Sequence, residues 1–355
     1  MNSVSGSPSG AATTEGAIMS WDRIRGHAEA KNTFRSAFAS GRFGQSYLFV
    51  GPEGVGKRLF AHELAKALLC ERPPAPLTAC DSCPGCAQIE AETHPDFITL
   101  RTPEGKHELP VDEMRAFCAR LSRKPSRGSR VIGVVEDADD FNAESANSFL
   151  KTLEEPPPGA VLILLATGTD RQLPTILSRC QIVRFRPLSS GDVAAVLAVK
   201  GIADPSRRDK LARLAGGSVA RAMALDDDAI WQVRETLVAG VTADRPNFPK
   251  LADAWARFVE EAGDDSAGKR TRASVVIGFL VDALRQSLRL ALGANASDID
   301  ATEESRLRAF AQRHGPDRLL ELIEKCVEAD YRVERRVQLI LVIESVLEQL
   351  TKATK

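Results

Sequence analysis

Residues 51–58 read GPEGVGKR, between the apolar run SYLFV (46–50) and the helix-forming segment LFAHELAKALLC (59–70). Glycines permit a tight turn whose successive backbone N–H groups can hold an anion, and a lysine adds positive charge at the β- and γ-phosphates of a nucleotide. Strand, glycine loop and helix in this order predict a phosphate-binding loop in an α/β fold with a parallel sheet. The loop residues expected to contact phosphate are Gly51, Gly54, Gly56 and Lys57.

The eighth position of this loop departs from the usual pattern. A Ser or Thr normally follows the lysine and binds Mg²⁺ through its hydroxyl, whereas this chain has Arg58. An arginine cannot coordinate a cation, and a cation ~4 Å away would be repelled by on the order of 4 kcal/mol per unit charge product. We therefore expect the Mg²⁺ site beside the loop to be defective.

A second apolar run, VIGVVEDADD (131–140), ends in acidic residues. A phosphate-loop enzyme keeps its metal-holding and water-activating carboxylates at such a place. The order here is Glu136 then Asp137, whereas a short carboxylate followed by a longer one would suit metal and water better. Two interpretations are open: residual metal binding, or acids that cap a strand. With Arg58, the pattern predicts that ATP can bind through the loop amides and Lys57 without fast hydrolysis.

Four cysteines follow the loop helix with the spacing C-x9-C-x2-C-x2-C, within residues 70–86. Two-residue gaps let neighbouring thiolates bind one ion, and four sulfurs complete the tetrahedral shell of a structural Zn²⁺. An iron–sulfur cluster is the alternative, although position 90, where a further cysteine would be expected, is Glu. Cys118 and Cys326 are expected to be buried thiols. The predicted zinc ligands are Cys70, Cys80, Cys83 and Cys86.

Composition places the chain among ordinary globular proteins. It has 355 residues, 27% of them charged, and a net charge of −1, so the total charge does not indicate a protein that binds nucleic acid alone. Residues 1–18 are small and polar and are expected to form a disordered tail without a signal peptide. The apolar run 273–292 is interrupted by Asp282 and Arg285, which favours a buried helix over a membrane span. These features predict a cytoplasmic protein without a membrane partner.

Three zones follow the tail. Residues 19–187 alternate strand-like and helical runs, and 70–86 form an insert within this zone. Residues 188–228 are predicted to form a small helical domain that opens with Ser189 as a helix cap, and 229–355 an all-α bundle. The charged stretch GDDSAGKRTR (263–272) is expected to be a solvated loop.

A basic stretch, RLSRKPSRGSR (120–130), carries five Arg or Lys residues. It could contact DNA phosphates, or it could be a solvated loop between a helix and a strand. The residues alone leave both interpretations open.

These motifs together resemble the AAA+ subunits of bacterial clamp loaders, most closely their delta-prime class. The resemblance rests on the phosphate loop, the cysteine insert and four further segments, and covers residues 19–228; beyond that it is limited to helical character. The four segments are WDRIRGHAEA (21–30), EDADDFNAESANSFLKTLEEPPPGA (136–160), LLATGTDRQLPTILSRC (164–180) and GGSVARAMAL (216–225).

The resemblance implies an AAA+ domain with a zinc insert, a helical lid and a C-terminal helical collar. Ser178-Arg179-Cys180 is similar to the family's SRC motif, whose arginine reaches the ATP site of a neighbouring subunit, while Thr167 falls near its sensor-1 position and Arg221 near its sensor-2 position. It implies a stator in a hetero-pentamer with gamma/tau and delta subunits, which loads the sliding clamp on primed DNA for the polymerase III holoenzyme. The alternative is a gamma/tau-type ATPase motor, which the altered loop disfavours.

Overall fold

The computed structural model describes residues 20–103, 106, 108–263, 266–294, 299, 301–334 and 337–351. The tail predicted over residues 1–18 lies outside them. The chain divides into two compact units, residues 1–186 and 187–355, each with its own core.

The first unit is built on a five-stranded sheet in the order β2-β3-β4-β1-β5, with every neighbouring pair parallel. Every residue of β1, β3 and β4 is buried, as expected for strands covered on both faces. The predicted parallel sheet is confirmed. The strands are β1 (Ser46–Val50), β2 (Phe97–Leu100), β3 (Val131–Val135), β4 (Ala160–Ala166) and β5 (Gln181–Arg184).

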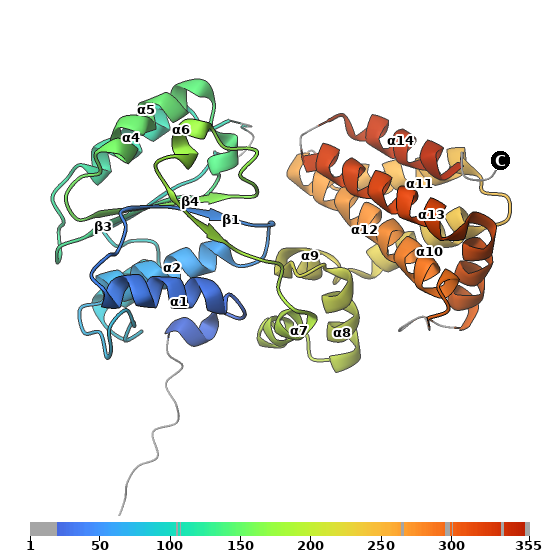
Figure 1. The fold of residues 1–355 in the computed structure, drawn as a ribbon, viewed down its shortest axis with the longest axis horizontal. Helices are drawn as coiled ribbons and strands as arrows, with labels where there is room; N and C mark the ends of the chain where they lie inside the picture. Colours follow the sequence, from blue (N-terminus) through green and yellow to red (C-terminus); the bar gives the residue numbers. More distant parts are fainter. Residues whose placement is uncertain are drawn as a thin grey trace, which may run out of the picture. The chain divides into compact units, whose positions relative to one another are not determined.

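Helices cover both faces of this sheet because successive strand side chains point to opposite sides (Figure 1). Phe49 packs with Phe34 and Phe60 of α1 and α2, whereas Leu48 belongs to the opposite cluster with Phe149 of α5. The helical elements of this unit are η1 (Ser20–Arg23), α1 (Ala28–Ala39), α2 (Lys57–Leu69), α3 (Pro84–Glu90), α4 (Val111–Leu121), η2 (Ala138–Asp140), α5 (Ala143–Glu154) and α6 (Pro174–Leu177).

Parallel strands bring their carboxyl ends to one edge of the sheet, which is where ligands of open α/β sheets bind. The glycine loop follows β1, the acidic pair follows β3 and Thr167 follows β4. Since β4 lies between β1 and β3, the three segments are neighbours along this edge.

The second unit is helical throughout its described residues. Ser189 caps α7 by accepting a hydrogen bond from the N–H of Asp192, and Gly216 and Gly217 separate α8 from α9, as predicted. Helix α13 is interrupted at Gly315 (φ 69°, ψ 166°), before Pro316. The helices are α7 (Ser190–Val199), α8 (Pro205–Leu214), α9 (Val219–Ala224), α10 (Asp228–Thr242), α11 (Phe248–Glu260), α12 (Ser266–Ala291), α13 (Ala301–Glu334) and α14 (Leu339–Thr351).

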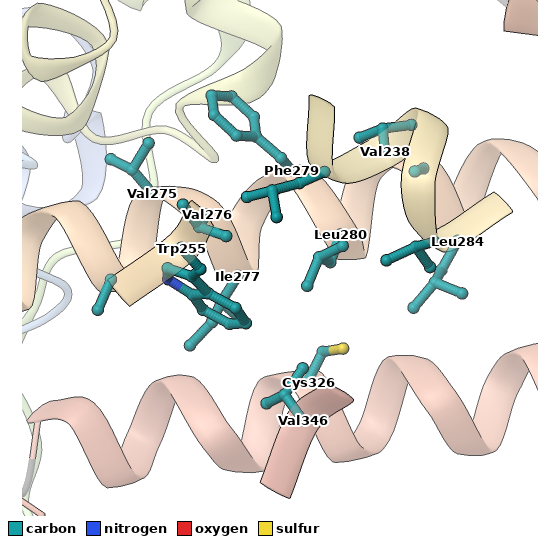
Figure 2. Packing of buried hydrophobic residues seen from close by; sticks show 14 of the residues in the cluster. Val238, Trp255, Val275, Val276, Ile277, Phe279, Leu280, Leu284, Cys326 and Val346 are labelled. Carbon is teal, nitrogen blue, oxygen red and sulfur yellow. The ribbon is translucent and has the colours of Figure 1, made fainter. Parts of the chain in front are cut away.

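One buried cluster runs from Leu188 to Leu350 through this unit, so the division predicted at residue 228 stays a prediction. Figure 2 shows part of this cluster, where Trp255 of α11 and Leu280 of α12 lie on the side of α12 that faces Cys326 of α13, and Phe279 lies on its other side. Cys326 is buried as predicted, whereas Cys118 in the first unit is only half-buried.

The prediction of a solvated loop over 263–272 is wrong, because α12 already begins at Ser266. The apolar run 273–292 does form a buried helix face, as predicted. Within the described residues, no helix combines the length and hydropathy that crossing a membrane requires.

Candidate functional site

The glycine loop has the backbone of a phosphate-binding turn. Gly54 and Gly56 adopt φ values of 73° and 102°, which side chains disfavour, and α2 begins directly after Gly56. A Cβ atom on Gly51 would lie 2.1 Å from the carbonyl oxygen of Phe185, so this position admits only glycine. Lys57 donates hydrogen bonds to the carbonyl oxygens of Gly51 and Pro52, which closes the loop on itself.

Arg58 is paired with the acidic residue at the end of β3. Its Nε lies 3.1 Å from Oε1 of Glu136, and its Nη2 donates to Oε1 of Glu92 at 2.7 Å. Arg101 adds a second cation, 3.7 Å from Oε1 of Glu136. Burial raises the pKa of the Glu136 carboxyl, and the charges of Arg58 and Arg101 oppose this rise.

A phosphate-loop enzyme keeps a metal-holding carboxylate at the end of such a strand, and here the guanidinium of Arg58 lies against that carboxylate. A Mg²⁺ ion requires oxygen ligands at close range and keeps an octahedral shell, whereas the nearest partner of Glu136 here is a fixed positive charge. The residues present do not fit a Mg²⁺ ion. This geometry accounts for the sequence departure at position 58.

The other acids after β3 hold neighbouring loops. Oδ2 of Asp137 accepts a hydrogen bond from the N–H of Thr102 at 2.9 Å. Asp139 accepts from the N–H of Thr167 at 2.7 Å and from Nε2 of Gln172 at 3.0 Å. Asp137 therefore fastens the loop after β2, and Asp139, which the sequence analysis did not single out, fastens Thr167 beside β4.

Arg179 follows α6 and lies near the end of α5. It forms an ion pair with Glu154 and donates from Nη1 to the carbonyl oxygen of Thr175 at 3.0 Å and to Oγ of Ser178 at 3.1 Å. Its side chain retains 31% of its accessible surface. The side chain is thus partly exposed while residues of its own chain hold it.

Arg221 belongs to the second unit, where it is largely enclosed. Its Nη2 donates to the carbonyl oxygen of Ser274 at 3.1 Å, and a Cβ atom on Gly278 would lie 1.5 Å from that nitrogen. Burial lowers the pKa of Arg221, and the charge of Asp330 opposes this. The predicted contact of Arg221 with nucleotide stays a prediction, and within its unit the residue joins α9 to α12.

The four cysteines of the insert converge as their spacing predicts. Their sulfur atoms all lie within 4.8 Å of one another. The N–H of Cys80 donates to Sγ of Cys70 at 3.3 Å, and the N–H of Cys86 donates to Sγ of Cys83 at 3.4 Å. Four sulfurs at this spacing fit a tetrahedral Zn²⁺ ion.

Lys66 of α2 connects the phosphate-loop helix to this insert, and the sequence analysis missed it. Its side chain is 4% exposed, and its Nζ lies 2.6 Å from Asp81, 3.2 Å from Glu90 and 3.4 Å from Glu63. Arg23 adds a second cation, 2.9 Å from Glu63. The insert is therefore joined to the helix after the glycine loop by ion pairs of the buried Lys66 side chain.

The basic stretch 120–130 lies between α4 and the amino end of β3, at the edge of the sheet opposite the glycine loop. The carboxylate of Asp96 accepts the N–H groups of Ser126 at 2.7 Å and Arg127 at 2.8 Å. Arg127 also pairs with Glu71 at 3.2 Å. Contacts with Asp96 and Glu71 hold this loop, and its contact with DNA stays a prediction.

Comparison with known proteins finds similarity to subunits of DNA polymerase III. The family model described as "DNA polymerase III, delta subunit" matches residues 26–189. The subunit delta' of Pseudomonas aeruginosa is 34% identical over 215 residues, 59% of this chain and 65% of that protein. The subunit delta' of Escherichia coli is 31% identical over 212 residues, 60% of this chain and 63% of that protein.

A third relative, the subunit tau of Salmonella typhimurium, is 30% identical over 317 residues, which is 82% of this chain and 48% of that protein. The match thus spans somewhat less than two thirds of the two delta' subunits and about half of the tau subunit. The matched family region includes the glycine loop, the cysteine insert and Arg179. The chain is therefore similar to the delta' subunits of DNA polymerase III, over a region that contains the glycine loop, the cysteine insert and Arg179.

Proposed function

We propose that this chain is the delta-prime, or stator, subunit of a replicative clamp loader, a cytoplasmic AAA+ protein that assembles with gamma/tau and delta subunits in a five-membered ring. In this role it helps to place a sliding clamp on primed DNA and does not act as a motor. Similarity to delta-prime subunits supports the proposal, and so does the fold of a phosphate-loop protein.

The observation that carries the non-motor assignment is the contact between Arg58 and Glu136. Hydrolysis of ATP in phosphate-loop proteins depends on a metal ion that bridges the phosphates and on a carboxylate or polar group that orients the water. The Arg58 guanidinium engages Glu136 and adds a repulsive charge toward any cation. ATP bound here would be held by the loop amides and Lys57 and would turn over negligibly.

The functional contribution that we assign to this chain is Arg179, delivered to the ATP site of a neighbouring subunit. A guanidinium is always charged and can contact two phosphate oxygens at once, so it stabilises negative charge in the transition state of phosphoryl transfer. Arg179 is partly exposed and lies outside its own glycine loop, which suits action in trans. Zinc in the insert would be purely structural, because four cysteines leave no open ligand position.

The alternative is a gamma/tau-type motor subunit, and the similarity to the tau subunit of Salmonella typhimurium favours it. Equilibrium ATP binding and steady-state hydrolysis, measured on the isolated chain and on the reconstituted ring, separate the two. Negligible turnover by the isolated chain together with an active ring supports the stator. Turnover at ~1 s⁻¹ or more, the low end of typical enzyme rates, would support the motor.

A further inference from the structure

The Arg179 side chain is held by hydrogen bonds and an ion pair with residues of its own chain. Nη1 donates to the carbonyl oxygen of Thr175 and to Oγ of Ser178, and Nη2 donates to the carboxylate of Glu154, the last residue of α5. Nε is buried and has no hydrogen-bond partner among the described residues. The arginine is therefore bound along one edge and covered along the other.

This arrangement conflicts with a two-pronged phosphate contact. Such a contact uses two N–H groups on one edge of the guanidinium. The Nη1–Nη2 edge is occupied by Thr175, Ser178 and Glu154, and the Nε edge is buried. A phosphate that contacts both Nη atoms must therefore compete with these partners, among which Glu154 is the one that carries a charge.

The ion pair between Arg179 and Glu154 is accessible to competing anions. The Arg179 and Glu154 side chains retain 31% and 49% of their accessible surface, so water and competing anions reach the pair. Exposed pairs of this kind contribute little to folding because solvent screens them. A terminal phosphate carries more negative charge than one carboxylate, so it can displace Glu154 from the guanidinium.

We propose that Glu154 holds Arg179 back in the unengaged subunit, and that the terminal phosphate of a nucleotide bound to the neighbouring subunit displaces it. This inference rests on the trans role proposed for Arg179. Glu154 is thus a positioning residue that sets how much nucleotide is needed to engage the arginine. Removing the charge of Glu154 lowers the nucleotide concentration needed to engage Arg179. It leaves the contact between Arg179 and the neighbour's phosphate unchanged.

The first test uses the full isolated chain and does not depend on the ring. Phenylglyoxal labelling of Arg179, followed by peptide mass spectrometry, reports how firmly the guanidinium is held. Glu154→Gln keeps the shape and removes the charge, and we expect labelling to be about 2- to 5-fold faster. Glu155→Gln, one residue further along, is the matched control and should label at the wild-type rate. Equal rates for Glu154→Gln and wild type would overturn the holding contact.

The second test measures clamp- and DNA-stimulated ATPase of the reconstituted ring across ATP concentrations. Glu154→Gln should lower the KM for ATP about 2- to 5-fold with kcat unchanged, and should have no effect when added to Arg179→Ala. If Arg179→Ala lowers the rate but Glu154→Gln leaves KM unchanged or lowers kcat, the inference is wrong. If Arg179→Ala matches wild type while labelling still responds to Glu154→Gln, the trans role fails and the holding contact stands.

Discussion

Nε of Arg58 lies 3.1 Å from Oε1 of Glu136, although the two residues belong to different strand–loop segments. One residue replaces the hydroxyl that would bind a metal, and the other is the carboxylate that would stand beside that metal. The positive charge that a metal ion supplies in a phosphate-loop enzyme is here supplied by a side chain. The loop can keep its fold in this way without a metal ion.

Restoring the loop sequence should therefore not restore a motor. Arg58→Thr supplies the missing hydroxyl, but Glu136 and Asp137 remain in the altered order, and Asp137 is engaged by the N–H of Thr102. We expect Arg58→Thr to stay below ~1 s⁻¹ in steady-state ATP hydrolysis. Arg101 still lies near Glu136 in this variant, and Arg101→Ala is the control for a general loss of positive charge. Turnover well above that rate in Arg58→Thr alone would mean that position 58 was the sole defect.

The cysteine cluster should hold one zinc ion per chain. Chelation, or Cys83→Ser, should increase hydrogen exchange in residues 70–90 more than in the strands of the sheet, because the metal closes a local insert. Cys118→Ser, outside the cluster, should leave zinc content and exchange unchanged. Elemental analysis that finds iron, or no metal after purification under reducing conditions, would contradict the assignment.

Lys66 should be more important for stability than any exposed lysine. Lys66→Ala leaves Glu63, whose side chain is 1% exposed, with Arg23 as its one close cationic partner among the described residues. Breaking a buried charge pair in this way costs about 3–5 kcal/mol of unfolding free energy. Lys151→Ala, an exposed position on α5, should change it by less than ~0.5 kcal/mol. Denaturant unfolding that finds equal effects for the two variants would show that the buried network contributes nothing.

Replacing Gly278 by Ala tests the position of the Arg221 side chain. Alanine at 278 would place a Cβ atom 1.5 Å from Nη2 of Arg221, so the guanidinium must give up its bond to the Ser274 carbonyl oxygen. We expect a loss of about 1–3 kcal/mol in the unfolding free energy. In the Arg221→Ala background, Gly278→Ala should cost much less, because the clash is gone. Gly191→Ala, whose Cβ meets no atom closer than 3.9 Å, is the matched control. Additive effects of the two substitutions at 221 and 278 would contradict this packing.

Local sequence patterns predicted the parts of this molecule that depend on neighbours in the chain. Apolar runs became the strands of the parallel sheet, and closely spaced cysteines converged because short gaps leave little freedom. The charged run 263–272 was misassigned as a loop, because helices with a solvated face are also rich in charge. Contacts across long sequence separations were not predictable: Arg58 with Glu92, Asp139 with Thr167, and Arg221 against Gly278 all require the fold.

The central claim is that this chain supplies Arg179 to a neighbour's ATP site, and the ATPase rate of the reconstituted ring tests it most directly. Arg179→Ala should assemble normally and keep its zinc, while the clamp- and DNA-stimulated rate falls. Trans arginines contribute ~10³-fold or more at a single site, but only a partial loss is expected where several sites act. Arg179→Lys should rescue poorly, since a point charge lacks the planar two-pronged contact. A ring that contains Arg179→Ala and hydrolyses ATP and loads clamps at wild-type rates would contradict the account.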